Sequence, residues 1–162
     1  MSVSIRSAGP ADAALVYAFI RELAAYEDLS DEVAATEADI AAALSGPSPR
    51  AFAEIAEQDG APVGFSLWFY TFSSFVGRCG IWLEDLYVRP DQRGRGTGRA
   101  LIENLARRCR DERLGRLEWS VLDWNAPSIA FYESLGARPN AGWTVYRTTG
   151  EALARLAEGA AD

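Results

Sequence analysis

The sequence predicts an α/β protein built on one mixed, mostly antiparallel sheet that is flanked by helices. Three strand-like segments follow one another closely between residues 51 and 88, which is typical of an antiparallel meander. Helix-like segments precede this meander, and strands and helices alternate after it. A length of 162 residues is enough for one domain with its own core, so a single domain over residues 1–162 is expected.

The first part of the chain predicts one strand and two helices. A short strand is expected at 3–7. Residues 12–27, DAALVYAFIRELAAYE, carry apolar side chains three and four positions apart, as one face of a helix does. That face holds Leu15, Val16, Phe19, Ile20 and Leu23. TEAD at 36–39 resembles a capping box with aspartate in place of glutamate, and the helix it opens should stop at residues 45–47.

The rest of the chain predicts strands and helices that turn residues separate. A turn at residues 59–62, DGAP, divides the first two strands, and Pro90 ends the third. Pro127 fits the first turn of a helix, where its missing N–H is tolerated. The expected strands are 51–57, 63–72, 80–88, 116–122 and 142–148. The expected helices are 97–113 and 126–135, with residues 150–158 as either a terminal helix or a frayed tail.

Composition excludes several kinds of chemistry. The chain has no histidine, and all 16 of its basic residues are arginine. This removes histidine-based metal sites, histidine-dependent triads, the lysine of a P-loop and Schiff-base lysines. Cys79 and Cys109 have neither metal-ligand nor redox spacing and are expected to be reduced structural thiols. We expect no metal.

Charge and hydropathy restrict the partners. A net charge of −7 and a pI of about 4.7 argue against nucleic-acid binding. No apolar run approaches the ~18 residues that a transmembrane helix needs, and the first residues lack a signal-peptide pattern, so a cytoplasmic protein without a membrane partner is expected.

Residues 1–60 carry eleven acids and three arginines, whereas residues 89–116 carry nine arginines and four acids. One region could attract a cation and another an anion.

Residues 89–101, RPDQRGRGTGRAL, predict an anion site. Glycines let main-chain N–H groups approach an anion closely, and the positive end of the following helix points to the same place. The stretch lacks the lysine of a P-loop, and its GxGxG spacing fits a dinucleotide fingerprint poorly. A pyrophosphate held by main-chain N–H groups and arginines is the interpretation that remains.

The pattern Arg93-x-x-Gly96-x-Gly98 resembles the acetyl-CoA pyrophosphate motif of the GNAT superfamily of N-acyltransferases. Residues 123–137, DWNAPSIAFYESLGA, resemble that superfamily's second cofactor-contacting segment. Further stretches are similar to its spermidine/spermine (diamine) and thialysine N-acetyltransferase branch. They are IRELAAYEDL at 20–29, TEADI at 36–40, LEDLYV at 83–88, WNAPSIAFY at 124–132 and GWTVYR at 142–147. The resemblance implies a single-domain GNAT fold.

The resemblance implies an enzyme that transfers the acetyl group of acetyl-CoA to an amine by direct attack in a ternary complex. An alkylamine of pKa ~10.4 is almost fully protonated at neutral pH, so a base must remove its proton. Glu84 is implied as that base, through a water, or as a substrate ligand; Asp85 is the alternative relay, and Tyr132 is implied as the general acid. The implied acetyl-CoA contacts are Leu86, Tyr87, Val88, Arg93, Gly94, Arg95, Gly96, Thr97, Gly98, Arg99, Asn125 and Ser128.

The resemblance also implies a small-molecule amine as the acceptor. The implied acceptor contacts are Tyr26, Glu27, Glu84, Asp85, Glu118, Trp119 and Ser120. These acids favour a cationic diamine or polyamine, with a basic amino acid such as thialysine or lysine as the alternative. A non-catalytic acyl-CoA-binding sensor is the alternative from a different class. Members of this branch are typically homodimers, so a homodimer is expected.

Overall fold

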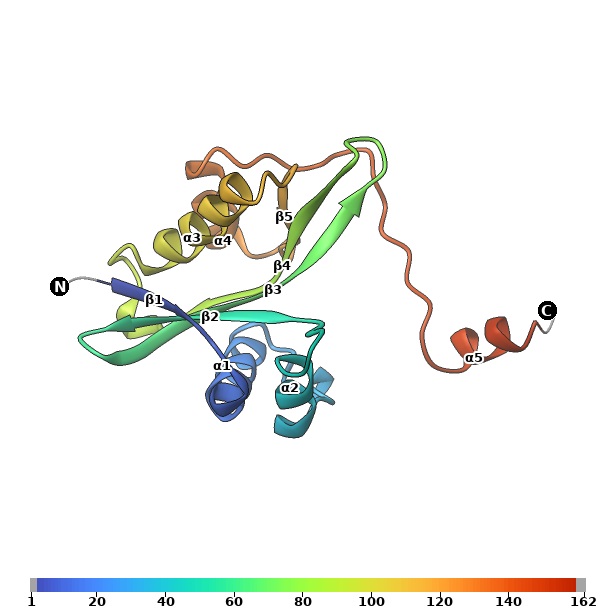
Figure 1. Cartoon of the computed structure of the whole chain (residues 1–162), viewed down its shortest axis with the longest axis horizontal. Coiled ribbons are helices and arrows are strands. Elements are labelled where there is room, and N and C mark those ends of the chain that lie inside the picture. The colour runs from blue at the N-terminus through green and yellow to red at the C-terminus, as the bar shows by residue number, and fades with distance from the viewer. Residues whose placement is uncertain (1–2, 160–162) are drawn as a thin grey trace. The chain divides into compact units, whose positions relative to one another are not determined.

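A computed structural model describes residues 3–159 of the chain (Figure 1). These residues form two compact units, one ending at Leu122 and the other beginning at Asp123. The first unit contains a sheet of five strands in the order β1-β2-β3-β4-β5. They are β1 (Val3–Ser7), β2 (Phe52–Gln58), β3 (Ala61–Ser73), β4 (Arg78–Val88) and β5 (Leu117–Trp119). β1 to β4 pair antiparallel and β5 pairs parallel to β4, which confirms the expected mixed α/β sheet.

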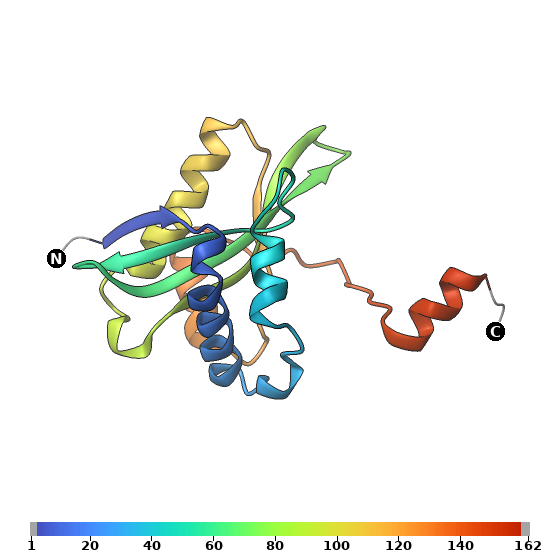
Figure 2. The ribbon, with the colours of Figure 1, turned by 60° about the horizontal axis from the view of Figure 1, so that its bottom comes forward.

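Helices cover both faces of this sheet. α1 (Ala13–Tyr26) and α2 (Glu37–Ala43) lie on one face, and α3 (Thr97–Asp111) lies on the other (Figure 1, Figure 2). The predicted capping box starts α2: the Thr36 hydroxyl accepts from the Asp39 N–H at 3.3 Å, and the Asp39 carboxylate accepts from the Thr36 N–H at 2.8 Å. Single 3-10 turns lie at Pro10–Asp12, Ser30–Glu32 and Pro90–Gln92.

The predicted apolar face of α1 builds the core on its side of the sheet. Val16 and Phe19 are fully buried, and the Phe19 ring stacks on Phe65 of β3 with 5.4 Å between the centroids. Burying a side chain of this size contributes about 1.5–3 kcal/mol. On the opposite face, Leu101 and Leu105 of α3 are fully buried. β4 contacts both α1 and α3, so it is held from both sides.

The second unit contains α4 (Ala126–Ser134) and α5 (Gly150–Glu158). α4 begins where it was expected, with Pro127 in its first turn, and residues 150–158 form a helix. The prediction of a strand at 142–148 is wrong, because this stretch forms no strand. Its aromatic and β-branched residues favour an extended chain, but a strand needs a neighbour for its main-chain hydrogen bonds, and none of the described residues supplies one.

The other predicted elements differ from the structure mainly at their ends. β5 covers only part of the predicted 116–122 because its pairing with β4 stops at Trp119. α1 stops at Tyr26, and Asp28, with a φ angle of 57°, turns the chain away from the helix axis. Among the residues that the structure describes, no helix has both the length and the apolar character needed to cross a membrane.

Candidate active site

The glycine loop joins β4 to α3 and leaves a row of main-chain N–H groups unpaired. Gly94 and Gly96 have φ angles of 73° and 85°, a left-handed conformation that favours glycine, and Gly96 is the N-cap of α3. Within the described chain, the N–H groups of residues 95–99 have no main-chain acceptor. They include the first N–H groups of α3, where the helix dipole is positive. The loop therefore offers several donors at once to an anion.

Arg89, at the start of this region, is engaged inside the protein. Its guanidinium forms a two-point ion pair with Glu22 of α1, at 2.9 and 3.1 Å, and donates to the Pro62 carbonyl oxygen at 3.1 Å. The same group lies 4.9 Å from the centroid of the Phe19 ring. These contacts fasten the end of β4 to α1, so Arg89 stabilises the layer that carries the loop.

Arg93 is engaged as well, because its side chain contacts both β4 and α1. The Arg93 Nε donates to the Val88 carbonyl oxygen at 2.8 Å, and its guanidinium carbon lies 4.5 Å from the centroid of the Tyr26 ring. Arg95 and Arg99 are exposed, and Arg99 lies 3.6 Å from Glu103 one turn further along α3. The side-chain charge that an anion at the loop would meet comes first from Arg95 and Arg99.

A β-bulge and an unpaired strand edge lie just before the loop. Trp68 of β3 pairs with Leu83 of β4, and Leu67 pairs with Asp85, so Glu84 is an extra residue in β4. β5 pairs with β4 only as far as Leu83. Beyond that point no strand of the described chain borders the β5 side of β4. Main-chain groups between the bulge and the loop can therefore bind an extended ligand as a neighbouring strand would.

Three carboxylates interact at this bulge. Asp85 is half-buried, and burial, followed by repulsion from Glu84 and from Glu27 at the end of α1, raises its pKa to about 7. Burial also raises the pKa of Glu27. A carboxyl group with a pKa near neutrality can take up and release a proton under working conditions, and the negative cluster favours a cation. The structure thus brings Glu27, Glu84 and Asp85 together on two elements that are distant in the sequence.

Neighbouring side chains hold two of the predicted acceptor contacts. The Trp82 Nε1 donates to a Glu84 carboxylate oxygen at 2.8 Å, and Arg116 forms an ion pair with Glu118 at 2.6 Å. Sequence reasoning missed Trp82 and Arg116. The signal was their spacing, because residues two apart on a strand share a face. The remaining predicted acceptor contacts of this region, at and after the end of β5, are Trp119 and Ser120.

The last predicted site residues lie at α4, in the second unit. Asn125 is the N-cap of α4, and its Oδ1 accepts from the Ser128 N–H at 3.3 Å. Tyr132 lies in the last turns of α4, and its ring centroid is 5.3 Å from that of Phe131. Gly136, with a φ angle of 87°, follows the end of the helix. The motif at 125–136 therefore encodes a short helix with an N-cap and a glycine after its C-terminus, in addition to any ligand contacts.

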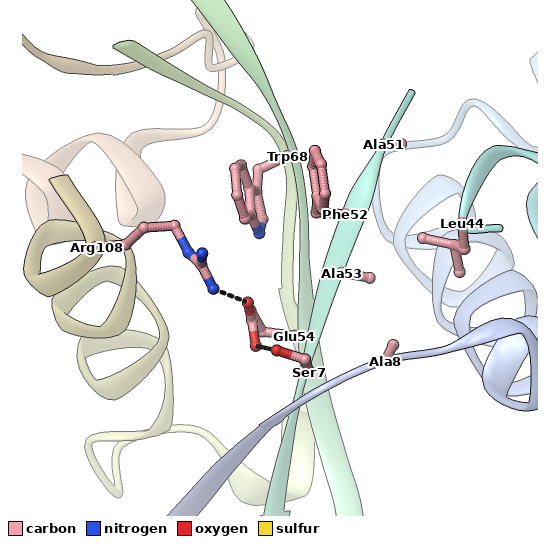
Figure 3. Close-up of a pocket in the computed structure, with 9 residues that line it drawn as sticks. All are labelled: Ser7, Ala8, Leu44, Ala51, Phe52, Ala53, Glu54, Trp68 and Arg108. Carbon is pink, nitrogen blue, oxygen red and sulfur yellow. Dashed lines mark hydrogen bonds and ion pairs between the residues drawn. The ribbon is translucent and has the colours of Figure 1, made fainter. Parts of the chain in front are cut away.

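The cavity drawn in Figure 3 has different chemistry, and no predicted site residue lines it. It measures about 60 Å³. Glu54 of β2 accepts from the Ser7 hydroxyl at 3.0 Å and lies 3.5 Å from Arg108 of α3. The Trp68 Nε1 and the Arg108 Nε are buried there without a partner among the described residues. A space of this size suits one or two waters that would satisfy these donors.

Metal and thiol chemistry find no support in the described part of the chain. No group of three or more acids, cysteines or histidines there could hold a metal ion. Both cysteines are free, and burial raises the pKa of the Cys109 thiol. A thiol of raised pKa is a weak nucleophile at neutral pH, which argues against Cys109 as an acyl carrier.

Comparison with known proteins identifies the family. The sequence model described as "Acetyltransferase (GNAT) family" matches residues 16–137. The chain belongs to the GNAT acetyltransferase family. This GNAT protein is 38% identical to the thialysine N-epsilon-acetyltransferase of Sus scrofa, over 96% of the chain and 98% of the relative. It is 30% identical to the spermidine/spermine N(1)-acetyltransferase-like protein 1 of Homo sapiens, over 94% of the chain and 23% of that protein.

Solved structures agree with this assignment. An integron cassette protein from the mobile metagenome of V. cholerae superimposes with a TM-score of 0.79 and 29% identity, over 98% of this chain and 99% of that one. A ribosomal-protein-alanine N-acetyltransferase from Brucella melitensis shares the fold, with a TM-score of 0.75 and 22% identity over 91% of this chain and 100% of that one. The predicted GNAT fold and the predicted acetyl-CoA-dependent N-acetyltransferase activity are confirmed.

Proposed function

We propose that this GNAT acetyltransferase acetylates a primary amine of a small, multiply charged cationic molecule. The observation that carries the proposal is the cluster of Glu27, Glu84 and Asp85 beside the unpaired edge of β4. Burial is the main cause of the raised pKa of Asp85, and repulsion from Glu84 and Glu27 adds to it, so the three carboxylates are close enough to interact. A cation seated at the cluster relieves this repulsion, which gives a basic acceptor an advantage over a neutral one.

The side-chain amine of a basic amino acid, such as thialysine or lysine, is the first acceptor in this proposal. Four relatives that are 32–38% identical over 92–96% of the chain are thialysine N-epsilon-acetyltransferases. A diamine or polyamine, which the sequence favoured, becomes the second candidate, supported by the 30% identical spermidine/spermine relative. Both kinds of acceptor carry a second ammonium group, which a short flexible chain separates from the reacting amine.

The loop and the edge of β4 fit acetyl-CoA, which supplies the activated acetyl group. The N–H groups of residues 95–99, with Arg95 and Arg99, would hold the pyrophosphate. Main-chain groups of residues 86–88 would hold the pantetheine arm, and one of their N–H groups would polarise the thioester carbonyl. Asn125 and Ser128 would contact the same arm.

Asp85 accepts the proton of the attacking amine in this proposal. Its pKa of about 7 matches the pH at which a base must be both deprotonated and able to accept a proton. Glu84, which the resemblance implied as the base, is exposed and held by Trp82, a position suited to orienting the ammonium group. Tyr132 donates a proton to the departing thiolate sulfur. The amine attacks directly, with acetyl-CoA and acceptor bound together.

A matched pair of acceptors tests the role of the cluster. Lysine and 6-aminohexanoate carry the same reacting amine and carboxylate, but only lysine has the second ammonium group. We expect kcat/KM to be at least about 10-fold higher for lysine, since one well-placed charge pair is worth about 1.4 kcal/mol or more. Glu27→Gln should lower this preference, while Asp111→Asn, an exposed acid at the end of α3, should leave it unchanged. Equal kcat/KM values for the two acceptors would contradict the proposal.

Further parts of the proposal follow from the resemblance. We propose a homodimer in the cytoplasm, with the two free cysteines reduced. The alternative from a different class, an acyl-CoA sensor without turnover, predicts acetyl-CoA binding but no CoA release with any amine of a broad panel. A CoA-release assay with thialysine, lysine, spermidine and putrescine separates the enzyme from the sensor.

A further inference from the structure

Arg93 joins three parts of the first unit. Its Nε donates to the Val88 carbonyl oxygen at the end of β4, at 2.8 Å. Its guanidinium carbon lies 4.5 Å from the ring centroid of Tyr26, the last residue of α1, and 5.7 Å from that of Tyr87 on β4. Arg93 itself begins the glycine loop. One side chain thus connects the loop, the end of β4 and the end of α1.

A guanidinium is suited to this connection. Its planar cation can lie over the face of a tyrosine ring while an in-plane N–H donates to a carbonyl oxygen. The Nε of Arg93 donates to the Val88 carbonyl oxygen, and the guanidinium group lies over the rings of Tyr26 and Tyr87. The neighbouring Arg95 is exposed, as Arg93 is, but it has no ring or carbonyl contact of this kind among the described residues. Arg93 and Arg95 therefore serve different purposes, although both belong to the same motif.

The end of α1 that Arg93 contacts continues directly into the carboxylate cluster. Glu27 follows Tyr26 and is the C-cap of α1, with its N–H bonded to the Leu23 carbonyl oxygen at 3.0 Å. The charge of Glu27 acts on Asp85. A ligand that orders the glycine loop would restrict Arg93, and Arg93 would restrict Tyr26 and the adjoining Glu27. The contacts form one continuous physical path between the two substrate regions.

We infer that Arg93 is a positioning residue that couples the two substrate sites. Binding at the glycine loop tightens binding of the cationic amine at Glu27 and Asp85, and amine binding tightens binding at the loop by the same factor. This inference rests on the proposed function. It assigns Arg93 a role between the sites, in place of the direct pyrophosphate contact that the resemblance implies.

Calorimetric titrations test the coupling without turnover. The dissociation constant of lysine is measured with and without saturating coenzyme A, which lacks the acetyl group, and the ratio of the two values is the coupling factor. We expect a factor of about 5 or more for the unaltered chain, in the usual range of coupling between sites. Arg93→Gln should bring the factor close to one, and Arg93→Lys, which keeps the cation but loses the planar fork, should restore part of it.

Three further variants make the test specific. Tyr26→Leu should also lower the factor, and the double variant Arg93→Gln/Tyr26→Leu should lower it no further, because both changes cut the same contact. Arg95→Gln should weaken coenzyme A binding and leave the factor intact. The Tyr26 arm also covers the case in which Arg93→Gln fails to fold.

The outcomes separate this inference from the proposed function. If no amine of the panel binds or reacts with the unaltered chain, the proposed function is wrong and the coupling falls with it. If the amines react but the coupling factor is one, or is unchanged in Arg93→Gln, the inference alone is wrong. Weaker coenzyme A binding in Arg93→Gln at an unchanged coupling factor would restore Arg93 as a pyrophosphate ligand.

Discussion

Replacing Asp85 by asparagine should stabilise the protein, and the gain should grow with pH. The pKa of Asp85 rises from 3.8 in the unfolded chain to about 7 in the folded protein, mainly through burial. Between these two values the unfolded chain has released the proton while the folded protein retains it, so stability falls as pH rises through this window. At about 1.4 kcal/mol per pH unit, the loss between about pH 5.5 and pH 8 amounts to about 2 kcal/mol.

Urea unfolding at the two pH values measures this loss. Asp85→Asn has no charge to lose at this position, so its gain over the unaltered chain should be about 2 kcal/mol larger at about pH 8 than at about pH 5.5. For a chain of this size the difference corresponds to about 4–8 °C in Tm. Asp111→Asn, which changes an exposed acid, serves as the matched control. A gain that is equal at both pH values would show that Asp85 titrates normally and refute the reasoning.

Three further predictions concern other residues. Tyr132→Phe should lower kcat by about 100-fold or more, because the phenol is the proposed general acid, and should change the Kd for acetyl-CoA little; an unchanged kcat would remove that role. Gly64→Ala should destabilise the fold by roughly 1–3 kcal/mol in urea unfolding, since the new Cβ would lie 2.5 Å from a main-chain oxygen of β4, whereas the uncrowded Gly9→Ala should be neutral. Arg89→Ala should cost about 2 kcal/mol because it removes the two-point ion pair with Glu22, and a loss below about 0.5 kcal/mol would show that solvent screens the pair.

Local signals in the sequence predicted most of the fold. The apolar spacing of Val16 and Phe19 identified the buried face of α1, and the Thr36–Asp39 pair identified the start of α2. These features depend on neighbours within one or two turns of a helix. The prediction of a strand at 142–148 was wrong because a strand does not depend on near neighbours alone. Its propensity is local, but a strand exists only when a second segment pairs with it.

The candidate site depends on contacts that local patterns do not contain. The bulge at Glu84 is a property of the register between β3 and β4, and one residue of difference in pairing creates it. The pKa of Asp85 depends on Glu27, which approaches it from α1. The contact of Arg93 with Tyr26 likewise joins the glycine loop to α1. The motif therefore predicted an arginine at the loop, but it did not predict that its side chain lies against α1.

Competition between acceptors tests the central claim most directly. The purified chain is given acetyl-CoA and an equimolar mixture of thialysine, lysine, 6-aminohexanoate, spermidine and putrescine, and the products are identified by mass spectrometry at low conversion. The account predicts that acetylated basic amino acids dominate, with the acetyl group on the side-chain amine, and that 6-aminohexanoate, which lacks the second ammonium group, reacts least. Preferential acetylation of 6-aminohexanoate, or no acetylated amine at all, would contradict it.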